Sequence, residues 1–514
     1  MKQRYSGLCI FLLSFFYIAY SPQAFSQGKV VVAAQNASPQ EKKSAQFICD
    51  GNNDQEEIMQ AMKSGKVVEL SSGDFYCLET IIGQNNILQG KGKQKTKIHF
   101  TNVEQGVVLG GKRSLMSLGK IKLSKGGKTI NSSKNLAQWI NPGDRVLITS
   151  SDDYNGLRSY YKKGESVIIS SVSGNSCTIK GGLKDDYNKK VSLTYYELAD
   201  HVGIQNLSVE MKNGSVCLYI KNATNAFYKN VALKDVTEKA KQGFRISHVY
   251  GFTYENLEAE GILQGHEKKL PHGYGFYISG AENGEISNCH GKNNKHSFEI
   301  SGYGASPVTR NIIVKNCSST NDWKAGFSTH GAASGIQWLN CTVKNGNGGF
   351  LLRSDHNQII NPVIDLRPDA LNAAFFFGEY TQQGGVWDKF DGIGGNNLQI
   401  KNAQVNCNNS QTPYFTFRDP IRHFHLEGGE FKGSPVSILS TEGNICHDFL
   451  IKNVTFHASR MRTLFNIYPG DGDDVVQLTF ENVTICGAGK DIQLVNTEND
   501  IELDVKNINM DCKQ

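Results

Sequence analysis

The sequence predicts an all-β protein folded as a solenoid of stacked coils. Short strands rich in aromatic and β-branched residues recur between Gly275 and Asp365, separated by Gly-rich turns and without helical spacing. The repeat is about 20 to 30 residues, which is typical of solenoids. A single coil of this length cannot bury its own apolar row, so we expect each coil to bury it against the next one.

Two residue types recur at fixed places in these coils. Each coil begins with an aromatic residue and closes on an Asn. The aromatic residues are Phe276, Phe298, Phe327 and Phe350, and the closing residues are Asn230, Asn256, Asn288, Asn316, Asn340, Asn361, Asn402, Asn453, Asn482 and Asn507. Asn tolerates the left-handed backbone of a tight corner, and stacked amides can bond to one another. We therefore interpret the Asn row as a structural ladder.

Residues 1–26 are predicted to be a signal peptide. Lys2 and Arg4 precede an apolar run from Leu8 to Tyr20, and small residues follow at Ala24 and Ser26. We expect the mature chain to be exported to a bacterial periplasm or beyond. No other apolar run is long enough to span a bilayer, so no membrane partner is expected.

Eleven of the 12 cysteines remain after cleavage, an odd number for an oxidising compartment. Cys289, Cys317 and Cys341 each follow a ladder Asn, and we expect them to pack inside the coils. Better disulfide candidates lie near the chain ends, namely Cys49 with Cys77 and Cys486 with Cys512.

The domain prediction divides the mature chain into three parts. Residues 27–140 hold a helix and the first coils; Ile58, Met59 and Met62 give the helix an apolar face that can cap the open solenoid end. Residues 141–200 interrupt the repeat and read as a small antiparallel β insertion. Residues 201–514 form the main solenoid. The residues of the insertion that could line a groove are Tyr154, Arg158, Tyr160 and Tyr161.

The start of the mature chain carries a family resemblance. Asp50-Gly51-Asn52-Asn53-Asp54, the amphipathic helix after it, and Val68 five residues before Gly73 resemble the opening of the pectate-lyase-like superfamily. This resemblance covers most of the mature chain and implies a right-handed parallel β-helix with an N-terminal capping helix. Members act on polysaccharides as lyases, C5-epimerases or glycoside hydrolases.

Strand alternation predicts which side chains leave the solenoid between residues 272 and 356. The aromatic residue of each coil points inward, so the second and fourth residues of each strand point outward, and adjacent coils lie about 4.8 Å apart. The outward positions are Tyr277, Glu299, Ser328, Leu351, Ser279, Ser301, His330 and Arg353. The flanking turns add His272, His296, Tyr303, Asp322, Trp323, Lys324, Asp355 and His356. This density of ionisable groups predicts a polysaccharide-binding groove.

The preferred activity is β-elimination or C5 epimerisation of a uronate-containing glycan. This chemistry needs a cation for the carboxylate, a base for the C5 proton and an acid. Arg353 suits the first role and His330 the second, while Tyr277, Tyr303 or His356 could be the acid. Asp322 or Glu299 could orient a histidine or bind calcium, although the sequence requires no cofactor.

Two alternatives stay open. Glu299, Asp322 and Asp355 could act as paired carboxylates of an inverting hydrolase, or the groove could bind glycan without catalysis. Only Thr329-His330-Gly331 resembles a polygalacturonase motif, and Leu352-Arg353 resembles part of the Leu-Arg-His-Gly motif of the chondroitinase B and alginate lyase type.

The expected partner is an acidic polysaccharide. A net charge of +5 fits a polyanion, but no Lys/Arg-rich segment with interleaved aromatic residues points to nucleic acid. The protein is expected to be a monomer or a trimer.

Overall fold

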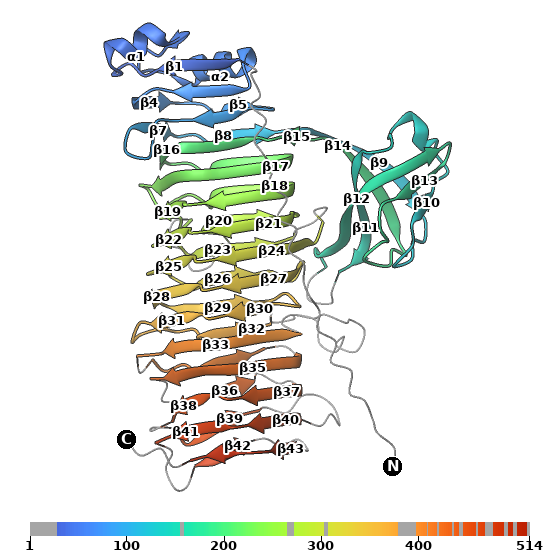
Figure 1. Ribbon diagram of the computed structural model, residues 1–514, viewed down its shortest axis with the longest axis vertical. Helices are drawn as coiled ribbons and strands as arrows, with labels where there is room; N and C mark the ends of the chain where they lie inside the picture. Colours follow the sequence, from blue (N-terminus) through green and yellow to red (C-terminus); the bar gives the residue numbers. More distant parts are fainter. Residues whose placement is uncertain are drawn as a thin grey trace, which may run out of the picture.

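The computed structural model describes thirteen stretches of the chain, and the predicted signal peptide lies outside them. They are residues 28–154, 159–264, 272–302, 307–378, 397–408, 410–418, 421–433, 436–441, 446–458, 461–467, 476–487, 492–496 and 501–510. Within these residues, 38 strands pair into one continuous set that winds along the long axis of the molecule (Figure 1). Strand pairs between successive coils are parallel, as in β20 with β23. The parallel β-helix predicted from the sequence is confirmed.

The coils present three strand stacks. The first stack carries the candidate site and contains β20 (Tyr274–Ser279), β23 (His296–Ser301), β26 (Ala325–Thr329), β29 (Gly348–Leu352), β32 (Phe375–Phe377), β34 (Phe415–Phe417), β36 (Leu439–Thr441), β39 (Thr463–Asn466) and β42 (Gln493–Asn496). The second contains β21 (Glu282–Ser287), β24 (Thr309–Lys315), β27 (Ala333–Leu339), β30 (Gln358–Ile360), β33 (Leu398–Asn406), β35 (Ile421–Lys432), β37 (Cys446–Lys452), β40 (Val476–Glu481) and β43 (Ile501–Val505). The third contains β19 (Glu258–Glu260), β22 (His290–Lys292), β25 (Ser318–Thr320), β28 (Thr342–Gly346), β31 (Val363–Leu366), β38 (Thr455–His457), β41 (Val483–Cys486) and β44 (Ile508–Asn509).

The N-terminal coils precede these stacks. Their strands are β1 (Lys29–Ala33), β2 (Phe47–Ile48), β3 (Val67–Leu70), β4 (Gly73–Cys77), β5 (Ile81–Gly83), β6 (Ile87–Gln89), β7 (Thr96–Thr101), β8 (Gln105–Gly110), β15 (Ala199–Asp200) and β16 (Gly203–Lys212), followed by the long β17 (Val216–Asp235) and β18 (Gln242–Glu255). The helices are α1 (Pro39–Ser44) and α2 (Gln55–Ser64). α2 lies at the N-terminal end of the stack in Figure 1 and buries Ile58, Ala61 and Met62. Among the described residues, no helix is long and apolar enough to cross a membrane.

Stacked aromatic rings fill the core behind the first strand stack. Phe276, Phe298, Phe327 and Phe350 lie in register and are fully buried, with successive ring centroids 4.6 to 5.0 Å apart. Offset or parallel aromatic stacking adds to the free energy gained from apolar burial. The inward direction predicted for the first position of each strand is therefore correct.

The Asn row forms the predicted ladder. Asn256 Nδ2 donates to Asn230 Oδ1 at 3.0 Å, and Asn340 Nδ2 donates to Asn316 Oδ1 at 3.1 Å. The ladder residues from Asn230 to Asn482 have φ values near +50°, the left-handed region that Asn tolerates. The same amide bond continues from Asn340 through Asn361 to Asn402, and from Asn453 through Asn482 to Asn507, so side-chain amides join many of the successive corners.

The cysteine predictions have mixed outcomes. Cys289, Cys317 and Cys341 are free thiols buried inside the coils, as expected. Cys49 and Cys77 are also free and buried, so the predicted disulfide between them is wrong for this structure. Cys486 is disulfide-bonded, and its predicted partner Cys512 lies outside the described residues.

A second, six-stranded antiparallel sheet emerges from the solenoid between β8 and β15. It comprises β9 (Lys112–Lys120), β10 (Thr129–Asn131), β11 (Arg145–Asp153), β12 (Lys162–Ser173), β13 (Ser176–Ile179) and β14 (Lys190–Glu197). The predicted insertion, residues 141–200, covers four of these strands. The sequence analysis placed β9 and β10 with the first coils because a short strand has the same alternation in either sheet. The sheet has its own apolar core, which includes Ile130, Ile148 and Leu193.

The insertion docks on the side of the solenoid, next to the middle coils (Figure 1). Arg310 on β24 forms an ion pair with Asp185 at 2.8 Å, and Lys184 pairs with Glu282 at 3.0 Å. The Arg310 and Asp185 side chains are 11% and 19% exposed, so their attraction is less screened than that of a surface pair. These contacts fix the insertion against β21 and β24 of the second strand stack.

Candidate active site

The outward column of the first strand stack follows the predicted alternation. Strand register aligns Arg245, Tyr277, Glu299, Ser328 and Leu351 on five successive coils. These side chains leave the solenoid, yet Glu299 and Ser328 are fully buried and Tyr277 is 9% exposed. Neighbouring side chains therefore cover part of this face.

Glu299, His330 and Arg353 meet on this face. His330 Nε2 lies 3.3 Å from Glu299 Oε1 and 3.3 Å from Arg353 Nη1. The Glu299 side chain is fully buried and that of His330 is 20% exposed. The three residues come from neighbouring coils, as strand alternation predicted. A permanently charged guanidinium, an imidazole and a buried carboxylate are thus in direct contact.

The insertion adds Tyr161 to this group. The Tyr161 hydroxyl lies 2.8 Å from His330 Nδ1, and the phenol ring contacts the imidazole edge with centroids 6.3 Å apart. Tyr161 is 1% exposed and packs with Ala332, Tyr154 and Tyr160. Because Nε2 faces a carboxylate, the bonding pattern favours a ring with its proton on Nε2, whose Nδ1 accepts from the Tyr161 hydroxyl. The docked insertion therefore completes the surroundings of His330.

Aromatic and cationic side chains extend the face toward the N-terminal coils. The Arg245 guanidinium lies 4.3 Å from the centre of the Tyr219 ring and 5.9 Å from that of Tyr277. Tyr274 stacks on Tyr277 with ring centroids 5.3 Å apart. Burial raises the pKa of both Tyr274 and Tyr277, so these phenols stay protonated at neutral pH. Rings of this kind offer flat apolar surfaces, and the cation favours an anionic ligand.

The predicted histidines His272 and His296 lie beside these rings. The ring centroid of His272 is 5.7 Å from that of Tyr274, and that of His296 is 5.9 Å from it. Burial lowers the pKa of both, and Arg353 further lowers that of His296. His296 Nδ1 donates to the Ala325 carbonyl at 2.9 Å. Both rings are therefore neutral at pH 7 and suit hydrogen bonding better than charge pairing.

Lysines occupy the edge of the face. Lys295 Nζ lies 5.8 Å from the centre of the Trp323 ring. Burial, with a contribution from Lys324, lowers the pKa of Lys295 to about 8. Burial and the charge of Arg353 lower the pKa of Lys324. Burial is the larger cause for both lysines, and the neighbouring cations add a positive field that a bound anion would relieve.

Asp322 does not join this group. Its carboxylate is buried in a turn inside the solenoid and accepts hydrogen bonds from the Asn294 N–H at 3.0 Å, the Ser297 N–H at 2.7 Å and the Ser319 hydroxyl at 2.8 Å. Strand alternation says nothing about side-chain direction in turns, which is why the sequence suggested a site role. Burial raises the pKa of Asp322 to about 7. We assign it a structural role in joining coils.

Asp355 and His356 form a separate pair. His356 Nδ1 lies 3.0 Å from Asp355 Oδ2, and this contact raises the pKa of His356. The His356 side chain is 58% exposed, and Asp355 bridges to Ser334 on the second strand stack. The predicted residues Tyr303 and Arg158 lie outside the described residues.

Tyr219, Arg245, Tyr274 and Lys295 belong to this face but were absent from the predicted set. The sequence contained enough information to predict two of these four residues. Alignment of the coils upstream of Gly275 by the same alternation places Tyr219 and Arg245 in the column of Tyr277. Tyr274 and Lys295 precede regular strand alternation, so pattern alone could not orient them.

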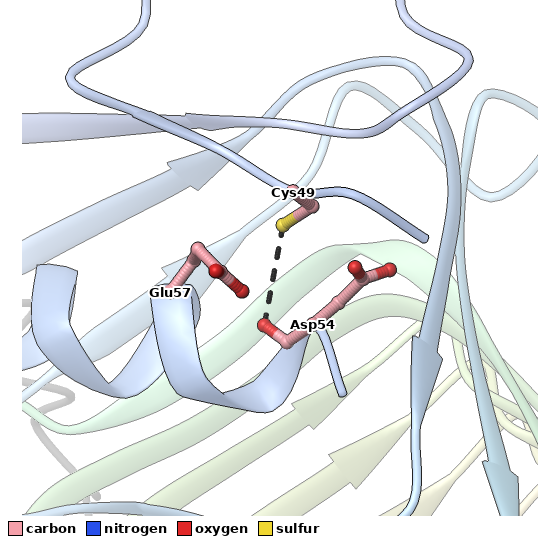
Figure 2. Close-up of side chains that lie close together, drawn as sticks. All are labelled: Cys49, Asp54 and Glu57. Carbon is pink, nitrogen blue, oxygen red and sulfur yellow. Dashed lines mark hydrogen bonds between the residues drawn. The ribbon is translucent and has the colours of Figure 1, made fainter. Parts of the chain in front are cut away.

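A possible metal-ligating group lies far from this face, beside α2. Cys49, Asp54 and Glu57 place one potential ligand atom each within 4.8 Å of the others (Figure 2). The Asp54 carboxylate already accepts from the Tyr76 N–H at 2.7 Å and from the Gly51 N–H at 2.9 Å. The Cys49 thiol donates to the Asp54 carbonyl oxygen at 4.0 Å, so it too is engaged within the protein (Figure 2). This group fits a structural role in the first coils.

Comparison with known proteins supports the fold. Neither a protein-family model nor a curated protein matches the sequence. Among solved structures, the tailspike gp61 of Pseudomonas phage phi297 is similar at a TM-score of 0.58 and 13% identity, over 88% of this chain and 70% of that one. The gp54 tailspike of Acinetobacter baumannii bacteriophage AP22 was solved with A. baumannii capsular saccharide. It has a TM-score of 0.56 and 17% identity, over 89% of this chain and 74% of that one. The tailspike gp49 of Pseudomonas phage LKA1 has a TM-score of 0.53 and 17% identity, over 86% of this chain and 77% of that one.

Proposed function

We propose that this protein is an enzyme that removes the C5 proton of a uronate in an acidic polysaccharide, leading to β-elimination or C5 epimerisation. The contact of Arg353, His330 and Glu299 on the outer face carries the proposal. It combines a fixed cation with a proton-transfer group, and C5–H abstraction requires both. The aromatic and cationic side chains around this group suit an acidic sugar chain.

Arg353 supplies the cation. Removal of the proton next to a carboxylate places negative charge on the carboxylate oxygens. A guanidinium binds two carboxylate oxygens in a planar fork, and this attraction strengthens as charge develops. Arg353 is half-buried and lies against His330, so the carboxylate it binds would place C5 near the imidazole.

His330 moves the proton. Glu299 lies at Nε2 and orients the ring, so the proton from C5 would go to Nδ1, whose lone pair becomes free when the Tyr161 hydroxyl turns away from it. In elimination the C5–H bond breaks and His330 takes the proton, the C4–C5 double bond forms, the C4–O bond breaks, and His330 passes the proton to the leaving oxygen. In epimerisation His330 takes the C5 proton and a protonated phenol on the other side of the sugar, such as Tyr277, gives a proton to the opposite face of C5. Glu299 can balance the positive charge of His330 while it holds the proton.

Hydrolysis by paired carboxylates has less support. That mechanism needs two carboxyl groups across one glycosidic bond. Of the three predicted carboxylates, Asp322 accepts hydrogen bonds inside a buried turn and Asp355 is paired with His356, which leaves Glu299 in contact with the cationic group.

The AP22 tailspike of similar fold was solved with a capsular saccharide, which adds support for glycan binding by this chain.

We also propose export to the periplasm or beyond, and a monomeric or trimeric state, on the sequence arguments above. Because Arg353 supplies the positive charge that the uronate needs, no metal cofactor is proposed.

The test uses purified mature protein and a panel of uronate polysaccharides. A rise in ultraviolet absorbance is expected if elimination forms the C4–C5 double bond. Without that rise, incorporation of deuterium at C5 from D₂O, followed by NMR, would report epimerisation. New reducing ends without either signal would refute the proposal in favour of hydrolysis, and no change by any measure would refute catalysis on these substrates.

A further inference from the structure

A pocket of about 200 Å³ lies immediately beside Arg353, on the side away from Glu299. Its lining residues include Lys324, Leu351, Arg353, Asn372, Phe376 and Arg418. None of the described lining residues is acidic, whereas three are cationic. The pocket thus concentrates positive charge next to the proposed reaction centre.

Strand register sets the spacing of two of these cations. Leu352, Phe377 and Phe417 are aligned on successive coils, so Arg353, Gly378 and Arg418 follow them in one column. Arg353 and Arg418 are therefore two coils apart, about 10 Å at the usual strand spacing. Gly378 occupies the coil between them and has no side chain to fill the space. This gap opens the pocket between two guanidinium groups.

The pocket lining combines apolar and polar side chains. Leu351 and Phe376 are aligned on successive coils, and the Arg418 guanidinium lies 4.8 Å from the centre of the Phe376 ring. The Asn372 side chain donates to the Asn347 carbonyl at 3.2 Å. A ring face, an amide and flanking cations suit one sugar unit that carries an anionic group.

We propose that this pocket is a second anion subsite, in which Arg418 binds the carboxylate of a uronate next to the one held by Arg353. This inference rests on the proposed function, because the first uronate lies at Arg353. The subsite would make the protein selective for runs of consecutive uronates over chains in which uronates alternate with neutral sugars. Arg418 would act in substrate selection and would not touch the reacting atoms.

The test compares Arg418→Gln with the natural protein on a polyuronate and on a polysaccharide of alternating uronate and neutral sugars. On the polyuronate we expect the variant to raise KM about tenfold or more with kcat within twofold. On the alternating polymer both constants should stay within twofold. Arg418→Lys, which keeps the charge, should recover much of the loss, and this recovery would exclude a folding defect.

Lys401→Gln is the matched control. Lys401 is a half-exposed cation on β33, paired with Glu427 at 3.2 Å, and lies on the second strand stack. Its substitution should leave KM unchanged on both polymers. A loss with Arg418→Gln that is equal on both polymers, or a loss also seen with Lys401→Gln, would overturn the subsite while the proposed function stands.

Calorimetric binding of a uronate trisaccharide separates the two proposals. Weaker binding by Arg418→Gln, with no turnover by any protein, would refute the proposed reaction and support the subsite. Equal binding by both proteins would refute the subsite. A trisaccharide with a sulfate ester on the neighbouring sugar shows whether the pocket binds a carboxylate selectively or binds any anion. Tighter binding of the sulfated ligand would overturn the assignment to uronate.

Discussion

Replacement of Arg353 by Ala tests the proposed chemistry most directly. The guanidinium lies 3.3 Å from His330 Nε2 and next to the pocket, so a uronate carboxylate bound there would accept a forked, charge-assisted pair of hydrogen bonds. Loss of one group that stabilises developing negative charge typically costs about 3 kcal/mol. That energy corresponds to a decrease in kcat/KM of about 10²-fold.

The same substitution should leave the fold intact. Arg353 leaves the solenoid, and the stacked core behind it is formed by Phe327, Phe350 and Phe375. We expect a loss of unfolding free energy below about 1 kcal/mol, as for most partly exposed positions. Arg353→Lys keeps the charge without the fork, so its kcat/KM should fall between those of the natural protein and the Ala variant.

The assay is initial-rate kinetics on the best polymer of the substrate panel, with urea denaturation of each variant. Lys315→Ala is the control, because Lys315 pairs with Glu285 at 2.9 Å on the second strand stack and both side chains are about 40% exposed. Full activity of Arg353→Ala would refute the assignment of this face as the reaction centre. Equal losses in both variants would point to a general electrostatic effect.

Four further predictions follow from the site and its support. Tyr161→Phe removes the hydroxyl at His330 Nδ1 and should lower kcat about tenfold or more with little change in unfolding free energy; unchanged kcat and pH–rate profile would leave Tyr161 only a packing role. Affinity for anionic oligosaccharide should decline as pH rises through about 8, because Lys295 loses its proton there in the protein without ligand, while a bound anion favours the protonated form; Lys295→Arg should remove this decline in calorimetric titrations, and its persistence would implicate another group. Phe298→Ala should cost about 3 to 5 kcal/mol of unfolding free energy, since the ring is fully buried between two others; a melting curve close to that of the natural protein would contradict the aromatic stack. Dialysis against EDTA should leave turnover unchanged, and activity restored only by added Ca²⁺ would instead support a calcium role.

The helix-free repeat between Gly275 and Asp365 was sufficient to predict the solenoid, the aromatic stack and the Asn ladder. Each depends on local backbone geometry repeated at nearly constant spacing, which a sequence records directly. Strand alternation also brought His330, Arg353 and Glu299 to one face, because register between coils follows from the aligned Phe residues.

Turns and long-range docking were beyond that reasoning. Asp322 looked like a site carboxylate, but backbone N–H groups of Asn294 and Ser297 draw it into the coil interior. Cys49 and Cys77 were predicted to form a disulfide and are free. Side-chain direction in a turn depends on which unsatisfied donors lie nearby, and no repeat pattern encodes that.

The sequence by itself determined the parallel β-helix, its inward aromatic residues and the outward row that contains Glu299, His330 and Arg353. Only the tertiary structure decided that the insertion folds back beside this row and places the Tyr161 hydroxyl 2.8 Å from His330. The physical reason is the separation along the chain. Coil neighbours are set by a short repeat, whereas Tyr161 and His330, 169 positions apart in the sequence, are brought together by docking contacts such as the ion pair of Arg310 with Asp185.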